Sequence, residues 1–431
     1  MPLLPKRLPI IKFLSLPILL IIGYACQEPQ AEQRVGSSIP FHEDPLVNVM
    51  AALEDDGRER IEIPETFTEE SARELEGQLD SLFNYYHKRR GFNGTVMVTK
   101  YDQVIFKSAF GYADLAKREP MTTDKAFQLA SVSKQFTAMA VMMLKEEGKL
   151  DYEDVIQEFF PEFPYPDITV KQLLTHRSGL SNYTYFSDEL WPDRSLPIFN
   201  NDVIDLMYAH QPPVYYRPNI RFDYSNTGYF LLASIVEKAS GMAFSDFLQE
   251  RIFKPLDMEH TFTYSDNLPT DLVVPGHERN RRKRNPDYLD YVLGDKGLYS
   301  TLDDLYKWDQ ALYTEKLVSK ETLEEAWMGS RVRKRRDNED YGYGWRIKEL
   351  KNGDIVHYHA GLWHGYNTYM LRNPKDHSTI IVLSNLSNGS LGFLKELQDF
   401  LYPITPPHAI ADSEQEVDNM ASSDSEPKKD A

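Results

Sequence analysis

The first regular pattern of apolar positions along the chain begins near Thr68 and ends at Gly91. Within it, apolar side chains recur every three or four residues, as is typical of a helix with one buried side: Leu75, Leu79, Leu82 and Tyr86. A threonine followed by glutamates is a favourable helix start, and a glycine is a favourable helix end. The pattern therefore predicts an amphipathic helix between these two residues.

Two short runs that alternate apolar and polar side chains follow, at residues 94–100 and 104–110. Alternation with a period of two predicts strands, and the three-residue link between them predicts a β-hairpin. A long apolar stretch at residues 136–150 comes next and is interpreted as a helix. The region from residue 152 to about 312 is mostly helical in pattern with proline-rich connections, and its clearest helices are predicted at residues 170–174, 227–240, 244–253 and 301–312.

Strand patterns return towards the C-terminus before a last amphipathic helix at residues 391–401. The predicted strands cover residues 341–347, 354–359, 366–372 and 379–384. Strands at both ends with helices between them favour an α+β fold of the α/β sandwich type. We therefore expect one antiparallel sheet built from N- and C-terminal strands, flanked by helices and carrying a large helical insert.

The N-terminal segment has the layout of a secretory signal. Three basic residues precede a short apolar run, residues 13–22, and small residues follow at Gly23 and Ala25. The run is too short to cross a bilayer as a helix. We predict a signal peptide over residues 1–25 and hence an exported protein.

Cys26, the single cysteine of the chain, stands directly after the predicted cleavage site. This arrangement resembles a bacterial lipoprotein signal, in which the mature N-terminal cysteine carries a lipid. Lipid attachment at Cys26 would make the protein a periplasmic or cell-envelope lipoprotein of a bacterium. Cleavage by the ordinary secretory peptidase and an uncleaved anchor are the alternatives, and the mass of the mature N-terminus distinguishes them. One cysteine also excludes an intramolecular disulfide and a cysteine-rich zinc site.

Composition divides the rest of the chain into three parts. Residues 26–66 are acidic and read as a tether, residues 67–404 as one folded domain, and residues 405–431 as a disordered acidic tail. The 431 residues are 41% hydrophobic, enough for a sizeable core. A formal charge of -18 argues against nucleic acid as a partner. The basic runs 279–284 and 331–336 are interpreted as solvated loops.

Ser131 and Lys134 stand three residues apart, just before the apolar stretch 136–150. In a helix this spacing places the hydroxyl and the ammonium on one face, and the helix N-terminus adds N–H donors and positive potential. A serine hydroxyl is a weak nucleophile, and a lysine among apolar neighbours can lose its proton and act as a base. The pair is therefore a candidate nucleophile and base that needs no histidine.

Tyr224 and Asn226 lie between a proline-rich stretch, residues 211–218, and the predicted helix 227–240. Residues two apart in an extended segment point the same way, so both side chains could face one pocket. The phenol could then relay a proton, and the carboxamide could donate to a substrate carbonyl. Taken alone, Tyr224 is better explained as a core aromatic with a satisfied hydroxyl.

His359 and Gly361 lie near the end of the predicted strand 354–359. Gly361 would let another backbone approach closely, and His359 would present a cationic or hydrogen-bonding edge to a substrate. A competing interpretation makes His357, His359 and His364 zinc ligands, because H-x-H on a strand projects to one face. No acidic residue occupies the expected neighbouring positions, so we favour no metal, with His357 and His364 as surface or packing residues.

Three motifs therefore stand in order along the chain: Ser131-x-x-Lys134, Tyr224-x-Asn226 and His359-x-Gly361. This order resembles the motifs of the serine β-lactamase and penicillin-binding superfamily, in its class C-related branch of esterases, peptidases and β-lactamases. Residues 173–180 (LLTHRSGL) and 297–301 (GLYST) are similar to stretches common in that branch. The resemblance covers residues 92–403 and implies a β-lactamase/transpeptidase-like fold.

The resemblance also implies a role for each motif residue. Ser131 would attack a carbonyl and form an acyl-enzyme, while Lys134 and Tyr224 share its proton, and which of the two is the base stays open. Asn226 would hold the substrate amide. The backbone N–H groups of Ser131 and Leu362 would form the oxyanion hole. No cofactor is implied, and the expected partner is a small-molecule or peptide substrate.

The third motif departs from the antibiotic-hydrolysing members, which usually carry Lys-Thr-Gly where this chain has His359. A neutral imidazole holds a carboxylate less firmly than a permanent ammonium. We therefore expect a peptidase, D-aminoacyl amidase or esterase ahead of an efficient β-lactamase. A non-catalytic envelope protein of the same fold, binding peptidoglycan or a partner, is the alternative from another class. An α/β-hydrolase is disfavoured because the chain has no G-x-S-x-G motif.

Overall fold

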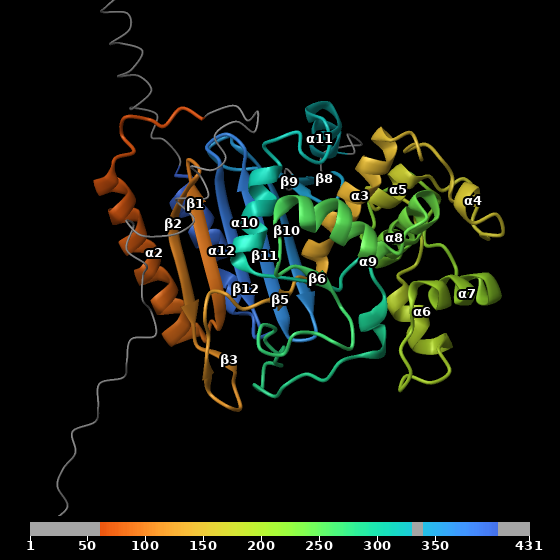
Figure 1. Ribbon diagram of the computed structural model, residues 1–431, viewed down its shortest axis with the longest axis horizontal. Helices are drawn as coiled ribbons and strands as arrows, with labels where there is room; N and C mark the ends of the chain where they lie inside the picture. The colour runs from red at the N-terminus through yellow and green to blue at the C-terminus, as the bar shows by residue number, and fades with distance from the viewer. Residues whose placement is uncertain (1–60, 330–338, 404–431) are drawn as a thin grey trace, which may run out of the picture. The chain divides into compact units, whose positions relative to one another are not determined.

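Strands from the two ends of the described chain form one seven-stranded sheet (Figure 1). The computed structural model describes residues 61–329 and 339–403. The sheet contains β1 (Gly94–Lys100), β2 (Gln103–Phe110), β8 (Glu339–Tyr341), β9 (Arg346–Glu349), β10 (Ile355–Trp363), β11 (Tyr366–Asn373) and β12 (Ser378–Ser384). The strand order is β2-β1-β12-β11-β10-β9-β8, with antiparallel neighbours throughout. The predicted α+β fold, with a sheet assembled from both ends, is confirmed.

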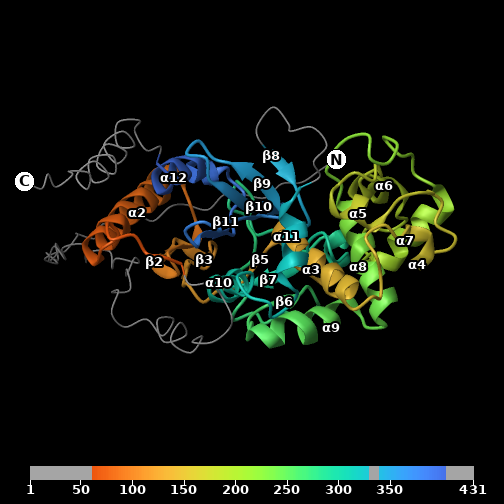
Figure 2. The same cartoon turned by 90° about the horizontal axis from the view of Figure 1, so that it is seen from above.

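Helices cover both faces of this sheet, as Figure 2 shows from above. One face carries α2 (Glu69–Arg90) and α12 (Leu394–Leu401), and the other carries α10 (Leu302–Ala311). Val96 and Val98 of β1 pack with α2 and α12, whereas Met97 joins the core on the side of α10. Successive residues of a strand point to opposite faces, so β1 contributes to both cores.

The predicted first helix is confirmed as α2, and its ends have the expected caps. Thr68 accepts the backbone N–H of Ser71 at 3.2 Å, and Gly91 adopts the left-handed conformation with φ 73°. Leu79 and Phe83 of this helix are completely buried against the sheet. The apolar positions read from the sequence are therefore the positions that dock the helix.

The helical insert surrounds α3 (Lys134–Glu146), which is buried continuously from its first residue to Leu144. A helix buried on all sides explains the unbroken apolar stretch seen in the sequence. Phe136 of α3 stacks on Trp308 of α10 with ring centroids 4.2 Å apart. The other helices of the insert are α4 (Ile156–Phe159), α5 (Val170–Leu174), α6 (Tyr183–Leu190), α7 (Asn200–His210), α8 (Asn226–Ser240) and α9 (Phe244–Leu248), the last continued by a π-helical turn, Gln249–Phe253.

One predicted strand is wrong. The run 341–347 was expected to form a single strand, but it splits into β8 and β9, which pair with each other. The chain reverses between them, where the N–H of Gly342 donates to the carbonyl of Trp345 at 2.9 Å and Gly344 has φ 80°. A left-handed glycine ends an extended run without steric cost, so the alternation of side chains on its own was misleading.

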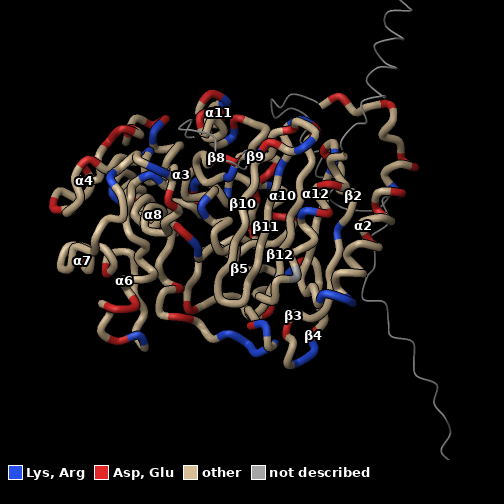
Figure 3. Tube along the Cα trace, turned by 180° about the vertical axis from the view of Figure 1, so that it is seen from behind, with Lys and Arg blue, Asp and Glu red and all other residues tan. Residues whose placement is uncertain are grey.

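Several predicted segments lie outside the described residues: the signal peptide, Cys26, most of the tether, the basic run 331–336 and the acidic tail. Within residues 61–329 and 339–403, no helix combines the length and apolar character needed to cross a bilayer. Figure 3 shows acidic and basic segments interspersed along the described trace.

His357 of β10 is a packing residue, which was the alternative to its interpretation as a zinc ligand. Its ring lies parallel to that of Trp327 at the end of α11 (Lys320–Trp327), with centroids 4.2 Å apart and an interplanar angle of 5°. Burial, together with the charge of Arg372, lowers the pKa of His357 to about 3. The folded protein therefore holds this imidazole neutral.

The first testable prediction concerns acid stability. The pKa of His357 is lower in the folded than in the unfolded state, so the unfolded state binds its proton first as the pH falls below about 6.5. Between pH 7.5 and 5.0 this group should reduce the free energy of unfolding by about 2 kcal/mol. His357→Phe keeps a ring on Trp327 but has no proton to bind. In urea unfolding, its free energy of unfolding should therefore fall by about 2 kcal/mol less than that of the native chain between pH 7.5 and 5.0. A change at the exposed His210 should leave the dependence as in the native chain.

Candidate active site

A short three-stranded sheet positions the residue predicted as the nucleophile. It contains β5 (Phe127–Gln128), β7 (Leu298–Ser300) and β6 (Phe262–Thr263). Directly after β5, the N–H of Leu129 donates to the carbonyl of Leu298 at 2.7 Å, and Ser133 Oγ accepts the N–H of Leu298 at 3.2 Å. These bonds anchor the 3-10 turn η1 (Ala130–Ser133), which carries Ser131 and leads into α3.

Ser131 therefore lies in a 3-10 turn ahead of α3 rather than within the α-helix. Residues three apart eclipse one another in a 3-10 turn, so the spacing still brings the two side chains together. Lys134 Nζ lies 3.1 Å from Ser131 Oγ. The Lys134 side chain is completely buried, whereas Ser131 is only half-buried and can meet a substrate.

Lys134 has three acceptors for its three ammonium hydrogens. Besides Ser131 Oγ, they are Asn226 Oδ1 at 2.9 Å and the carbonyl of Asp295 at 2.7 Å. Because a lysine ammonium only donates, the oxygen of the Asn226 carboxamide must face it. The amide nitrogen of Asn226 is thereby left to donate, and its bond to a substrate carbonyl stays a prediction.

Tyr224, which comes just before α8, contacts the same hydroxyl. Its phenol donates to Ser131 Oγ at 2.9 Å, and Lys134 Nζ lies 5.1 Å from the centre of its ring. Ser225 between the two motif residues is extended, with φ -135° and ψ 127°, and precedes the first turn of α8. The extended geometry turns Tyr224 and Asn226 to the same side. Hydroxyl, amine, phenol and carboxamide thus meet at one point.

His176 fixes the backbone on both sides of Tyr224 by bonding to the residue before it and the residue after it. Its carbonyl accepts the N–H of Asp223 at 2.8 Å, and its ring Nδ1 accepts the N–H of Ser225 at 3.3 Å. The ring also packs on the Tyr224 ring, with centroids 4.2 Å apart. Burial and then the nearby charge of Lys134 keep the pKa of His176 well below its ordinary value, so Nδ1 stays an acceptor. In the sequence, His176 stands out only as part of the stretch 173–180, which is similar to one common in the resembling family.

The second prediction follows from this contact. His176→Phe keeps the packed ring but loses the acceptor for Ser225, so the Tyr224 phenol should lose its fixed position. We expect kcat to fall by about 10-fold to 100-fold with little change in KM, the size of effect that a small misplacement of a reacting group produces. His176→Asn, which keeps an acceptor, should recover part of the loss. Equal activity of the two variants would contradict this role for the ring nitrogen.

His359 lies at the site but does not present a cationic edge. Nδ1 lies 2.8 Å from the carbonyl of Ala360 and Nε2 lies 2.9 Å from the hydroxyl of Tyr341. A carbonyl only accepts, so Nδ1 carries the hydrogen and Nε2 accepts from Tyr341. Burial, then the charges of Lys134 and Arg346, hold the pKa of His359 well below its ordinary value. The structure therefore corrects the cationic alternative, because the ring is neutral and 1% exposed.

Gly361 permits the close approach that the sequence predicted. A Cβ atom at this position would lie 2.3 Å from the carbonyl oxygen of Leu129 and 3.0 Å from the Cβ of Ala130. Strand β9 pairs with β10 only as far as Tyr358, and η1 contacts β10. The oxyanion hole of Ser131 and Leu362 backbone N–H groups stays a prediction. The Leu362 side chain itself is 64% exposed.

Two residues beside the nucleophile were missed in the sequence. Asp295 contributes its main-chain carbonyl, while its carboxylate accepts the hydroxyl of Tyr183 at 3.2 Å and pairs with Lys296 at 3.5 Å. Arg346 lies with its guanidinium carbon 5.7 Å from the Tyr224 ring centre. Asp295 was missed because any residue type can supply a main-chain carbonyl. Arg346 was missed because it lies in the run that was wrongly assigned to one strand.

The three histidines of the zinc alternative do not converge. His357 stacks on Trp327, His359 bonds to Tyr341, and His364 Nδ1 lies 3.2 Å from Asp290 Oδ1. Among the residues that the structure describes, no group of three or more histidine, cysteine or acidic side chains is arranged to hold a metal ion.

Known proteins of one family are similar to this chain over most of its length. The Beta-lactamase family profile matches residues 79–400. Penicillin-binding protein 4* of Bacillus subtilis (strain 168) is 33% identical over 363 residues, which cover 80% of this chain and 80% of that protein. The octameric penicillin-binding protein homologue from Pyrococcus abyssi superimposes with a TM-score of 0.66 at 28% identity, over 74% of this chain and 76% of that one.

A more distant solved structure shares the fold alone. The D-amino acid amidase from Ochrobactrum anthropi SV3 has a TM-score of 0.62 at 22% identity and covers 77% of this chain and 99% of its own. The family match spans most of the described chain, and a relative of 33% identity covers four-fifths of it. This chain therefore belongs to the Beta-lactamase family, within the superfamily of serine β-lactamases and penicillin-binding proteins.

Proposed function

We propose that this protein is a serine hydrolase of the cell envelope that cleaves an amide or an ester through an acyl-enzyme on Ser131. The observation that carries the proposal is the pair of contacts to Ser131 Oγ, from Lys134 Nζ at 3.1 Å and from the Tyr224 hydroxyl at 2.9 Å. An amine and a phenol within hydrogen-bond reach are the partners that a serine needs to become a nucleophile.

In the proposed reaction, one member of the pair Lys134 and Tyr224 starts deprotonated, as a neutral amine or a phenolate. Ser131 Oγ attacks the substrate carbonyl carbon, and its proton passes to that base. The C–N or C–O bond then breaks, and the pair returns a proton to the leaving amine or alkoxide. Water attacks the acyl ester in a second step, which releases a carboxylic acid and restores the serine. The two backbone N–H groups named above would stabilise the oxyanion in both steps.

Arg346 supports a substrate that carries a carboxylate. With His359 neutral, the Arg346 guanidinium is a permanent positive charge beside Tyr224 and Tyr341, at 5.7 Å and 6.0 Å from the two ring centres. Arginine suits carboxylate binding because its planar fork donates two parallel hydrogen bonds. We therefore favour peptides and D-aminoacyl amides with a free carboxylate over neutral esters. The amidase and penicillin-binding names among similar proteins are consistent with this choice.

The third prediction tests Arg346. Arg346→Gln should raise KM about 10-fold to 100-fold for a substrate with a carboxylate, the value of a lost charge-assisted hydrogen bond. For a neutral ester of the same acyl group, KM should change little. Arg221→Gln is a suitable control, because Arg221 is exposed and stacks on Tyr216. Equal losses on both substrates would contradict a carboxylate-binding role.

Labelling with a fluorophosphonate or a penicillin probe tests the proposed function directly. The native protein should be labelled on Ser131, as mass analysis of its peptides will show, and Ser131→Ala should take up no label there. A folded native protein that never acylates would instead support the non-catalytic peptidoglycan- or partner-binding role.

The envelope location rests on the N-terminal sequence. Export, with lipid attachment at Cys26, would place the domain on the outer side of the cytoplasmic membrane, where peptides of the cell wall are available. Membrane anchoring by a lipid predicts a mature N-terminus with the mass of a modified cysteine. An unmodified Cys26 would remove that part of the proposal and leave the catalytic part unaffected.

A further inference from the structure

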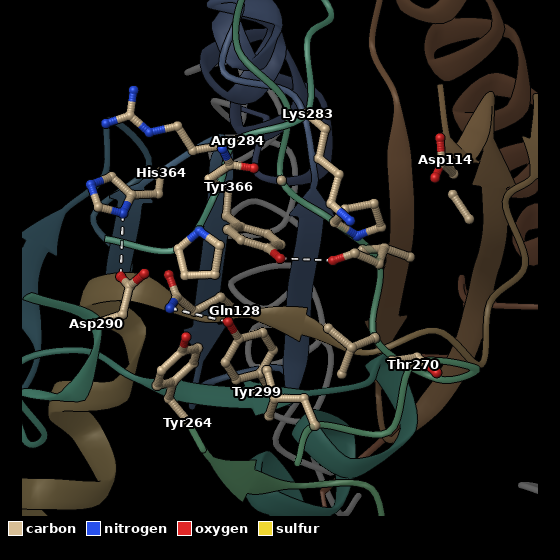
Figure 4. A pocket seen from close by; sticks show the side chains of 18 of the residues that line it. Asp114, Gln128, Tyr264, Thr270, Lys283, Arg284, Asp290, Tyr299, His364 and Tyr366 are labelled. Atoms are coloured by element: carbon tan, nitrogen blue, oxygen red, sulfur yellow. Dashed lines mark hydrogen bonds and ion pairs between the residues drawn. The ribbon is translucent and has the colours of Figure 1, made fainter. Parts of the chain in front are cut away.

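A cavity of about 500 Å³ lies outside the catalytic group (Figure 4). Ser131, Lys134, Tyr224 and Asn226 are not among its lining residues. Its walls come from the segment 264–290, from the short hairpin of β3 (Tyr112–Asp114) and β4 (Glu119–Pro120), and from β5, β7 and the β10–β11 turn. The volume is in the range of ordinary small-molecule sites.

The walls of this cavity are held in place by hydrogen bonds. The Tyr366 hydroxyl donates to the carbonyl of Val274 at 2.7 Å, and Asn385 Nδ2 donates to the carbonyl of Pro275 at 3.2 Å. A Cβ atom at Gly276 would lie 2.4 Å from the carbonyl oxygen of His364, so this loop packs tightly against the β10–β11 turn. A ligand would therefore meet a cavity that is already formed.

One buried polar group in the cavity lacks a partner. Gln128 is 2% exposed, and its Nε2 donates to the Tyr299 hydroxyl at 3.3 Å, but its Oε1 has no hydrogen bond among the described residues. Turning the carboxamide over would exchange the unpaired acceptor for an unpaired donor. A ligand with an amide group, which both donates and accepts, satisfies Gln128 in either orientation.

Most of the charged groups that line the cavity have a polar partner. Asp114 pairs with Lys117, Glu119 with Lys125, Asp290 with His364, and Arg284 with Glu278, while Asp266 accepts the hydroxyl of Tyr291. Among the lysines and arginines that line the cavity, Lys283 alone has no ion pair to any residue that the structure describes. In Figure 4, Lys283 and Arg284 stand on one side of the cavity, across from Gln128, Tyr264 and Tyr299.

Of the basic run 279–284, Lys283 and Arg284 line the cavity, and because Arg284 pairs with Glu278, Lys283 supplies the unpaired positive charge on this side, the rim. Tyr264 and Tyr299 add flat apolar surface opposite the rim, on which a peptide plane or a small side chain can lie. A ligand therefore needs an amide for the interior and a negative group for the rim.

We propose that this cavity binds a short anionic peptide, with a peptide group hydrogen-bonded to Gln128 and a carboxylate beside Lys283. The proposal is independent of the chemistry at Ser131, since binding requires no bond to be broken. It also assigns a role to the basic run, which was interpreted from sequence as a solvated loop.

Calorimetric titration of the full chain carrying Ser131→Ala tests the proposal without cleavage of the probe. N-acetyl-alanyl-glutamate should bind saturably, and its diamide should bind more weakly. Adding Lys283→Gln should weaken binding of the acid about threefold, as for an exposed ion pair, and should leave the diamide unchanged. Gln128→Leu should weaken both ligands about tenfold, the usual value of one hydrogen bond. Arg279→Gln, on the same exposed run but outside the lining, should have no effect.

Three outcomes would overturn the proposal. They are the absence of saturable binding, equal affinity for the acid and the diamide, and loss of binding in Tyr224→Phe but not in Gln128→Leu, which would place the peptide in the catalytic group. Lys283 is exposed, so its variant should fold even if Gln128→Leu does not. Labelling of Ser131 is a separate measurement, and a failure in either experiment leaves the other result standing.

Discussion

Lys134→Met is expected to lower the rate of acylation at Ser131 by about 10³-fold, within the range for loss of a positioned acid–base group. Methionine keeps an unbranched apolar side chain in the buried position but has no hydrogen to donate. Ser131 Oγ, Asn226 Oδ1 and the carbonyl of Asp295 would lose their common donor in one substitution. The time course of fluorophosphonate labelling measures this rate directly.

The matched control is Lys145→Met on the same helix. Lys145 is at the outer end of α3 and pairs with Glu325 at 3.4 Å, where both side chains are partly exposed. Such a pair contributes little, so labelling should proceed at the native rate. If a folded Lys134→Met protein acylated within about tenfold of the native rate, the lysine would not be part of the proton transfer.

Tyr224→Phe should lower kcat/KM by about 10²-fold, again as expected for a group that passes a proton. The phenyl ring keeps its packing on His176, and only the hydroxyl that donates to Ser131 Oγ is removed. Separate measurement of labelling and of release of the acyl group shows in which step the hydroxyl takes part. Tyr215→Phe, at an exposed tyrosine nearby in the chain, should leave both steps unchanged.

Comparison of these two variants bears on the question that the sequence left open. A larger loss of acylation for Lys134→Met than for Tyr224→Phe would make the amine the principal proton acceptor, and the reverse order would favour the phenol. Native rates in both variants would contradict the shared role of the pair.

Apolar periodicity predicted the elements that pack through their own side chains. Helix α2 shows its buried positions as a three-to-four repeat, and β1 shows its two faces as an alternation. The short strands β5, β6 and β7 have two or three residues each, too few to show any period, although β5 and β7 hold the nucleophile turn. Turns set by glycine also escape such a pattern, as the split at Gly344 shows.

The side chains of the first two motifs were predicted from the sequence, whereas the main-chain carbonyls that support them were missed. Ser131, Lys134, Tyr224 and Asn226 meet as their motifs implied. The carbonyls of Asp295 and His176 also hold these residues in place, as acceptors for Lys134 Nζ and for the N–H of Asp223. Every residue type has a carbonyl, so the sequence does not single them out. The cavity lined by Gln128 and Lys283 was not predicted because its lining comes from many separate segments, and their proximity exists only in the folded chain.

The pairing of β1 with β12 has a consequence for how the protein is made. Strand β1 is among the first parts of the domain to leave the ribosome, but its inner neighbour spans Ser378–Ser384, close to the end of the domain. The strand that backs the nucleophile turn, β10, is also synthesised late. A polypeptide released by premature termination before these strands would carry every residue of the first two motifs. It would still be inactive, because the strands that support these residues would be absent.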